Sequence, residues 1–148
     1  FNGPTREVRK LFLERTKNID ASIDDRVNRT KKLFKIIGYE GIDLDTDDFY
    51  ENVKMSVERG GTDDTGFGRQ LTAILGSSNR LNKVKSIEAK TFIVHGYEDP
   101  LINVKNAYKA HSLISNSQLK IIPDMRHLIE PPVFDQFKED LLIHLNSL

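Results

Sequence analysis

The stretch that decides the fold is Thr91-Phe92-Ile93-Val94-His95-Gly96, a run of β-branched and aromatic residues that stops at a glycine. A short apolar run of this composition is typical of a strand buried in a parallel sheet. Apolar positions at helical spacing follow from Val104 to Ile114, and a second short run, Leu119-Lys120-Ile121-Ile122, stops at Pro123. The order strand, helix, strand predicts a right-handed crossover between two parallel strands.

A C-terminal helix is expected after Pro131-Pro132, because proline favours the first turn of a helix. Its apolar face would be formed by Phe134, Phe137, Leu141 and Leu145. The region from residue 81 to 148 is therefore predicted to be a βαβα unit of an α/β fold. Two strands alone make a poor sheet, so we expect its neighbouring strands to come from elsewhere.

The residues before this unit predict four short amphipathic helices, because apolar side chains recur there every three or four positions. Ser22 followed by Asp25 resembles a capping box at the start of the second helix, and Gly38 can end that helix. Thr46 can cap the third helix, which would end at Gly60-Gly61. This pattern indicates a helical region over residues 1–80.

The composition excludes several classes of protein. The 148 residues include 22 Lys and Arg against 22 Asp and Glu, so the formal net charge is zero. Without an excess of positive charge to bind phosphates, we expect no nucleic-acid partner. No apolar run is long enough to span a membrane, and the absence of cysteine excludes disulfides and thiolate nucleophiles. We expect a cytoplasmic protein.

Two polar side chains follow the two predicted strands. Asp99 comes just after the first strand, and His127 comes just after the second. Catalytic groups of open α/β sheets gather at the carboxyl ends of the strands, and neighbouring strands lie about 4.8 Å apart. The two loops can therefore bring the carboxylate onto the imidazole ring. A carboxylate that accepts from one ring nitrogen fixes the tautomer and leaves the other nitrogen free to take a proton.

Several stretches together carry a family resemblance: Arg69-Gln70-Leu71, Asn79-Arg80-Leu81, Ile87, the first strand with His95-Gly96, Glu98-Asp99-Pro100-Leu101-Ile102, Ile122-Pro123-Asp124-Met125-Arg126-His127 and Pro131. On these residues, the region 69–132 resembles the C-terminal end of an α/β-fold hydrolase of the esterase and lipase type. The resemblance implies that Asp99, in the HGxxDP segment, is the acid of a catalytic triad and that His127 is its base. It also implies a helical cap over residues 1–80 and the C-terminal part of the hydrolase sheet over 81–148.

The chain departs from the family pattern at several positions. Arg126 stands where the family usually has glycine before the histidine, and Lys90 and Asn103 stand where it often has proline. No G-x-S-x-G motif occurs, and Gly76-Ser77-Ser78 lacks the second glycine. In the family the nucleophile precedes the cap. We therefore expect the C-terminal half of a hydrolase, with its nucleophile upstream of Phe1.

The resemblance implies a small ester-like substrate and no cofactor. Without a nucleophile the chain would be inactive alone, and it would pair with a missing N-terminal half or with a second copy of itself. The alternative is a non-catalytic binding or assembly module with a hydrolase-like fold.

The remaining histidines are expected to have structural roles. A metal site made of His95, Asp99 and His127 has usable ligand types but matches no compact motif, so we expect no metal. His95 should make a structural hydrogen bond at the end of its strand. His111 and His144 are expected on helix surfaces.

Overall fold

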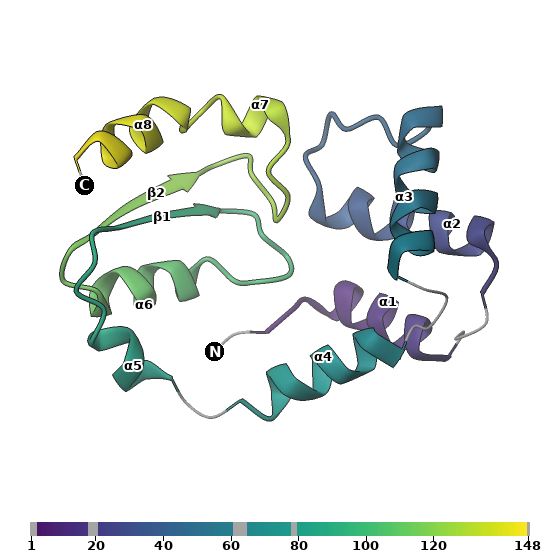
Figure 1. The fold of residues 1–148 in the computed structure, drawn as a ribbon, viewed down its shortest axis with the longest axis horizontal. Helices are drawn as coiled ribbons and strands as arrows, with labels where there is room; N and C mark the ends of the chain where they lie inside the picture. Colours follow the sequence, from purple (N-terminus) through teal and green to yellow (C-terminus); the bar gives the residue numbers. More distant parts are fainter. Residues whose placement is uncertain (1–2, 18–20, 61–64, 78–79, 148) are drawn as a thin grey trace. The chain divides into compact units, whose positions relative to one another are not determined.

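The computed structural model describes residues 3–17, 21–60, 65–77 and 80–147, apart from the side chains of residues 16, 17 and 65. The elements, labelled in Figure 1, are α1 (Arg6–Lys17), α2 (Ile23–Ile37), α3 (Asp47–Gly60), α4 (Thr65–Leu75), α5 (Leu81–Lys85), β1 (Thr91–Gly96), α6 (Lys105–Leu113), β2 (Ser117–Ile122), α7 (Pro131–Phe134) and α8 (Lys138–Asn146).

The chain divides into two compact units. One, here called the helical unit, comprises Thr5–Ile36 and Glu40–Ser78. The other, here called the sheet unit, comprises Phe1–Pro4, Ile37–Tyr39 and Asn79–Leu148. The short segment Ile37–Tyr39 thus belongs to the sheet unit although helical-unit residues flank it on both sides.

The sheet unit contains the predicted parallel crossover. Strands β1 and β2 pair in parallel, with Thr91 opposite Ser117 and Gly96 opposite Ile122. Helix α6 connects them and contacts both strands, while α7 and α8 lie on the other side (Figure 1). The expected strand–helix–strand order is confirmed, and the short helix α5 before β1 is an addition that no apolar periodicity indicated.

The core of the sheet unit lies between the strands and the two C-terminal helices. Its buried members are Ile122, Met125, Val133 and Phe137, and four partly buried residues pack against them: Tyr39, Phe92, Val94 and Leu141. Phe92 and Val94 are two positions apart on β1, so they share the face that meets α7 and α8. Full burial of a side chain such as Ile122 or Val133 stabilises the fold by about 1.5–3 kcal/mol.

The prediction of one continuous C-terminal helix was wrong. The chain leaves the helical conformation between α7 and α8, and Phe137, with φ −136° and ψ 0°, is the N-cap residue that precedes α8. Phe137 is buried in the core, where its ring meets the Phe134 ring edge-on at 5.3 Å between centroids. The Phe137 N–H donates to the Phe134 carbonyl at 3.1 Å, three residues back rather than four, so the hydrogen-bond pattern of a continuous α-helix is interrupted here.

The surface position expected for His144 was also wrong. Its ring stacks on Phe92 of β1 at 5.6 Å, and the residue is only 8% exposed. The neighbouring apolar residues Leu142, Ile143 and Leu145 are exposed instead. His111 is exposed as expected, with its Nδ1 2.9 Å from the Ser117 hydroxyl.

Helices α2 and α3 begin where the capping residues Ser22 and Thr46 predicted. The Ser22 hydroxyl accepts the Asp25 backbone N–H at 3.1 Å, and Thr46 Oγ1 accepts the Phe49 N–H at 3.1 Å. Helix α2 ends immediately before Gly38, and α3 ends at Gly60. Side chains at the N-cap therefore satisfy N–H groups that the first helical turn leaves without intrahelical partners.

Two aromatic pairs join helices of this unit, one between α1 and α4 and one between α2 and α3. The rings of Phe12 in α1 and Phe67 in α4 meet edge-on at 5.2 Å. The rings of Phe34 in α2 and Phe49 in α3 meet in the same way at 5.6 Å. Edge-to-face contacts of this kind add to the stabilisation from apolar burial.

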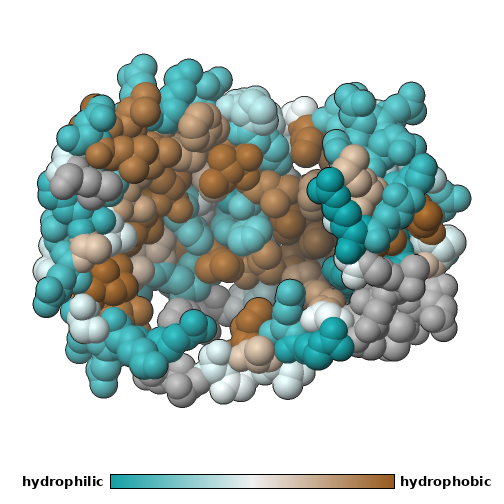
Figure 2. Space-filling model, in the orientation of Figure 1, coloured by the Kyte–Doolittle hydropathy of each residue, from teal (hydrophilic) through white to brown (hydrophobic). Residues whose placement is uncertain are grey.

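The strands of the sheet unit are incompletely covered. Residues 91–95 of β1 are only partly buried, whereas parallel strands usually lie under helices or further strands on both faces. Figure 2 shows hydrophobic residues at the surface over α8 and the adjoining strands. Across the described ranges, none of the helices has the length and apolarity needed to cross a membrane.

Candidate active site

The Asp99 carboxylate is held by the loop in which it lies. This loop follows β1, and Asp99 Oδ1 accepts the backbone N–H groups of Leu101 and Ile102, each at 2.8 Å. Pro100 donates no backbone N–H, so the next two amides form the turn around the carboxylate. The side chain is 3% exposed, and its second oxygen, Oδ2, remains available for another donor.

That donor is His127, in the loop after β2. Its Nδ1 lies 2.8 Å from Asp99 Oδ2, and its side chain is 30% exposed. An ionised carboxylate can only accept a hydrogen bond, so Nδ1 carries the proton and the neutral ring presents a lone pair at Nε2. No group in the described part of the chain hydrogen-bonds Nε2. The pair thus consists of an oriented imidazole with a basic nitrogen open to a reactant.

His95, at the end of β1, supports the Asp99 loop. Its Nε2 lies 2.8 Å from the Ile102 carbonyl oxygen and 3.6 Å from Asp99 Oδ2. A carbonyl can only accept, so His95 Nε2 is the donor. The expected structural hydrogen bond of His95 is confirmed. Because the Ile102 N–H also binds Asp99 Oδ1, the Ile102 backbone connects His95 to the carboxylate.

These contacts keep the Asp99 carboxylate ionised. Burial raises the pKa of Asp99, but hydrogen bonds from His127 and from the Ile102 and Leu101 amides together lower it by more. The pKa therefore lies below its ordinary value of 3.8. An ionised carboxylate stabilises a positive charge on the adjacent ring, which is the charge that His127 acquires when it takes a proton.

Gly96 allows the two loops to approach each other closely. A Cβ at position 96 would lie 2.2 Å from the carbonyl oxygens of both Met125 and Arg126, closer than any real contact. Beside it, the Tyr97 N–H donates to the Ile122 carbonyl at 2.9 Å, and the Glu98 N–H donates to the Met125 carbonyl at 3.2 Å. Gly96, the last residue of β1, thus permits the close approach of the loop that carries His127.

A third segment, which the sequence analysis missed, holds the His127 loop. The Ile37 carbonyl accepts the N–H groups of His127 at 2.8 Å and Leu128 at 3.2 Å. Two residues further on, the Tyr39 N–H donates to Glu130 Oε1 at 3.1 Å. We call this set of three hydrogen bonds the backbone clamp. The Tyr39–Glu130 bond joins residues 91 positions apart. The two bonds to the Ile37 carbonyl are made between main-chain groups, so no side-chain pattern in the sequence could have indicated them.

No set of three or more His, Asp or Glu side chains in the described ranges is arranged to hold a metal ion. The hydrogen-bond partners of the Asp99 carboxylate are the His127 ring and two backbone amides, and each of them donates a proton to it. The arrangement is therefore suited to acid–base chemistry at His127.

Comparison with solved structures identifies the architecture. An esterase, EaEST, from Exiguobacterium antarcticum superposes with a TM-score of 0.65 at 18% identity, over 95% of this chain and 47% of the esterase. The fold is that of the α/β-hydrolases. A variant of the meta-cleavage product hydrolase CumD gives a TM-score of 0.62 at 16% identity, over 100% of this chain and 52% of that enzyme.

A third solved structure gives the same result. Another variant of CumD, from Pseudomonas fluorescens IP01 and complexed with acetates, gives a TM-score of 0.61 at 18% identity, over 99% of this chain and 52% of the enzyme. The chain thus spans about half the length of these α/β-hydrolases. No protein-family model matches the sequence. A search of curated proteins gives no match either.

Proposed function

We propose that this chain carries the acid and the base of a serine-hydrolase triad, Asp99 and His127. The observation that supports the proposal best is the 2.8 Å contact between Asp99 Oδ2 and His127 Nδ1, with Nε2 of the same ring left open. The nucleophile is a serine outside these 148 residues, because they contain no G-x-S-x-G motif and span half of an α/β-hydrolase.

The reaction follows from the orientation of the ring. His127 Nε2 takes the proton of the serine hydroxyl as its oxygen attacks the carbonyl carbon of an ester-like substrate. The same nitrogen gives that proton to the departing alcohol, which leaves an acyl-serine. Water, deprotonated by Nε2, then attacks the acyl carbon, and Nε2 returns that proton to the serine oxygen as the acid is released. In each half-reaction Asp99 stabilises the imidazolium without taking its proton.

Within this proposal the two parts of the chain have different roles. Residues 1–80 act as a helical cap that contacts the substrate, and residues 81–148 supply the end of the catalytic sheet. The partly covered strands favour this assignment, because the remaining sheet of a complete hydrolase would cover them. No cofactor or metal takes part in the proposed chemistry.

A second reaction class is carbon–carbon bond hydrolysis. It is suggested by the two CumD variants, which are named as forms of a meta-cleavage product hydrolase. Ester and carbon–carbon hydrolysis are compatible with the same acid–base pair, since fold alone does not fix the chemistry. A non-catalytic module is the remaining alternative, and it predicts no turnover of either substrate class.

The test uses the full-length protein and p-nitrophenyl esters of increasing acyl length, together with a vinylogous diketone that is cleaved at a carbon–carbon bond. Replacing His127 by alanine should abolish turnover of the preferred substrate while the circular dichroism spectrum is unchanged. His111→Ala, at an exposed histidine, is the matched control and should retain full activity. Equal activity of the His127→Ala and His111→Ala proteins would contradict the proposal.

A further inference from the structure

The Asp99 carboxylate has a second imidazole beside it, which the proposed reaction does not use. The Nε2 atom of His95 lies 3.6 Å from Asp99 Oδ2, whereas the Nδ1 atom of His127 lies 2.8 Å from the same oxygen. A separation of 3.6 Å is too long for a hydrogen bond. His95 therefore makes no direct hydrogen bond to the carboxylate, and its influence on Asp99 passes through another group.

That group is the backbone of Ile102. The His95 ring donates from Nε2 to the Ile102 carbonyl oxygen at 2.8 Å, and the Ile102 N–H donates to Asp99 Oδ1 at 2.8 Å. Within the described ranges these are the hydrogen bonds of the Ile102 backbone, and both are made to side chains. Ile102 lies in a loop, outside the helices and strands, so its position depends on these two contacts.

The sheet gives the His95 ring a fixed point of attachment. His95 belongs to β1 and lies opposite Ile121 of β2 in the parallel pair. Its side chain is 15% exposed and that of Asp99 is 3% exposed, so water competes little for their hydrogen bonds. A group attached to a strand is held more precisely than one attached to a loop. The His95 ring can therefore transmit the rigidity of the sheet to the loop that carries Asp99.

We propose that His95 is a positioning residue for the Asp99–His127 pair. Its hydrogen bond holds the Ile102 backbone, and the Ile102 amide in turn keeps Asp99 Oδ1 in place, so that Oδ2 faces His127. Without the His95 donor, the carboxylate turns more freely and the His127 ring loses part of its orientation. The inference rests on the proposed function, because it concerns the same acid and base.

The size of the effect follows from the donors that remain. The Leu101 N–H also donates to Asp99 Oδ1 at 2.8 Å, and this bond does not involve His95. Loss of the His95 donor should therefore loosen the carboxylate without releasing it. We expect kcat to fall about 10–100-fold, which is the range for a reacting group displaced by a fraction of an ångström to an ångström. KM should hardly change, since His95 is not expected to contact the substrate.

The kinetic test compares three substitutions of His95 in the full-length protein. His95→Gln keeps an N–H donor close to the position of Nε2, whereas the amide of His95→Asn is one methylene too short and His95→Leu has no donor. For the preferred substrate, kcat should fall about 10–100-fold in the asparagine and leucine variants and less than about threefold in His95→Gln. His111→Leu, at an exposed histidine, is the matched control and should keep the parent kcat.

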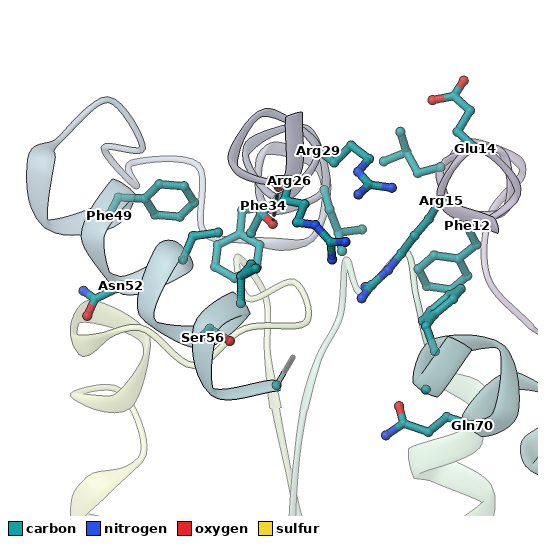
Figure 3. A pocket seen from close by; sticks show the side chains of 18 residues that line it. Phe12, Glu14, Arg15, Arg26, Arg29, Phe34, Phe49, Asn52, Ser56 and Gln70 are labelled. Carbon is teal, nitrogen blue, oxygen red and sulfur yellow. Dashed lines mark hydrogen bonds between the residues drawn. The ribbon is translucent and has the colours of Figure 1, made fainter. Parts of the chain in front are cut away.

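A spectroscopic measurement reports on the pair without turnover. The proton between His127 Nδ1 and Asp99 Oδ2 should give a far-downfield signal in the proton NMR spectrum, and it should be sharp only while both groups are held. We expect the signal in the parent and in His95→Gln, and a broadened or absent signal in His95→Leu. Asn52→Ala, in the wall of the helical-unit cavity shown in Figure 3, should leave it unchanged, because every residue that lines this cavity belongs to the helical unit.

Two results would overturn the positioning role. One is a His95→Leu protein with the parent kcat and the parent NMR signal, and the other is an equal loss of kcat in His95→Gln and His95→Leu. Thermal unfolding shows which variants are folded at the assay temperature, and His95→Asn replaces His95→Leu in both comparisons where the leucine variant is unfolded. Failure of the proposed function is distinguishable, since His127→Ala would then keep its activity while the NMR comparison still tests His95.

Discussion

Asp99 Oδ2 and His127 Nδ1 lie 2.8 Å apart, although 28 positions separate these residues in the sequence. The contact depends on the register of the sheet. Because Gly96 lies opposite Ile122 in the parallel pair, the loops that carry the two side chains leave the sheet at the same level. Three donors on Asp99 and the backbone clamp on His127 then fix both partners.

Replacing Asp99 by asparagine should lower kcat for ester hydrolysis by about 10,000-fold in the full-length protein. The asparagine amide can donate to His127 Nδ1, which moves the ring proton to Nε2 and removes the basic lone pair. Steady-state kinetics would measure the loss. Asp124→Asn is the matched control, since Asp124 is exposed and accepts from Gln136. An Asp99→Asn protein within tenfold of the parent rate would contradict the role of Asp99.

The lowered pKa of Asp99 predicts a specific loss of stability in acid. A carboxyl whose pKa is lower in the folded state stabilises the fold above its ordinary pKa of 3.8, and this stabilisation disappears as pH falls through the lowered value. The free energy of unfolding of the parent should therefore decrease relative to Asp99→Asn as the pH falls below the ordinary pKa of 3.8. Urea titrations of both full-length proteins measure it. If the free energies of unfolding of the two proteins changed with pH in the same way, the hydrogen bonds to the Asp99 carboxylate would not stabilise the fold.

A methyl group at position 96 should disrupt the site. In Gly96→Ala the new Cβ would meet two backbone carbonyl oxygens at 2.2 Å, and backbone cannot move aside as a flexible side chain can. We expect a destabilisation of about 1–3 kcal/mol or more and loss of activity, as the two loops are forced apart. Gly3→Ala, where nothing lies within 4 Å, should be neutral in the same thermal unfolding assay. Normal stability of Gly96→Ala would contradict the close approach.

The backbone clamp predicts a difference between two substitutions of Glu130. Glu130→Gln keeps an oxygen that can accept the Tyr39 N–H, so it should change stability little. Glu130→Ala leaves that N–H without its partner and should cost about 1–3 kcal/mol. Chemical denaturation of the full-length protein distinguishes the two. Equal effects of the two variants would show that the hydrogen bond to Tyr39 does not stabilise the loop.

The incomplete cover of the strands predicts self-association of the 148-residue chain when it is produced alone. Apolar surface is exposed to water at the partly buried strands and at three residues of α8, Leu142, Ile143 and Leu145. Exposed apolar patches of this kind favour association. Sedimentation should give dimers or larger species, and a dye that senses apolar surface should bind. A monodisperse monomer that binds no dye would contradict this expectation.

Much of the local structure could be predicted from the sequence. The caps at Ser22 and Thr46, the strand that ends at Gly96 and the crossover to β2 are each encoded in a few neighbouring residues. The positions of Asp99 and His127 after their strands were predictable for the same reason. Local chemistry determines where an element begins or ends, and strand order determines which loops are neighbours.

What could not be predicted depends on contacts between distant residues. The spacing of Phe134, Phe137 and Leu141 fits a continuous helix, yet the backbone leaves the helical conformation at Phe137, which is buried in the core. His144, a polar residue in a helix, was expected at the surface, but its ring stacks on the ring of Phe92 in β1. The two hydrogen bonds that the Ile37 carbonyl accepts in the backbone clamp join main-chain groups that every residue possesses, so their position depends on the tertiary fold alone.

The central claim is that His127 activates a serine that lies outside these 148 residues. The most direct measurement is the reaction of the full-length protein with a fluorophosphonate, followed by mass spectrometry of the labelled peptide. We predict a labelled serine outside residues 1–148 and labelling that is slowed at least about 1,000-fold in His127→Ala. Labelling of His127→Ala at the parent rate, or no labelled serine in the active parent protein, would contradict the account.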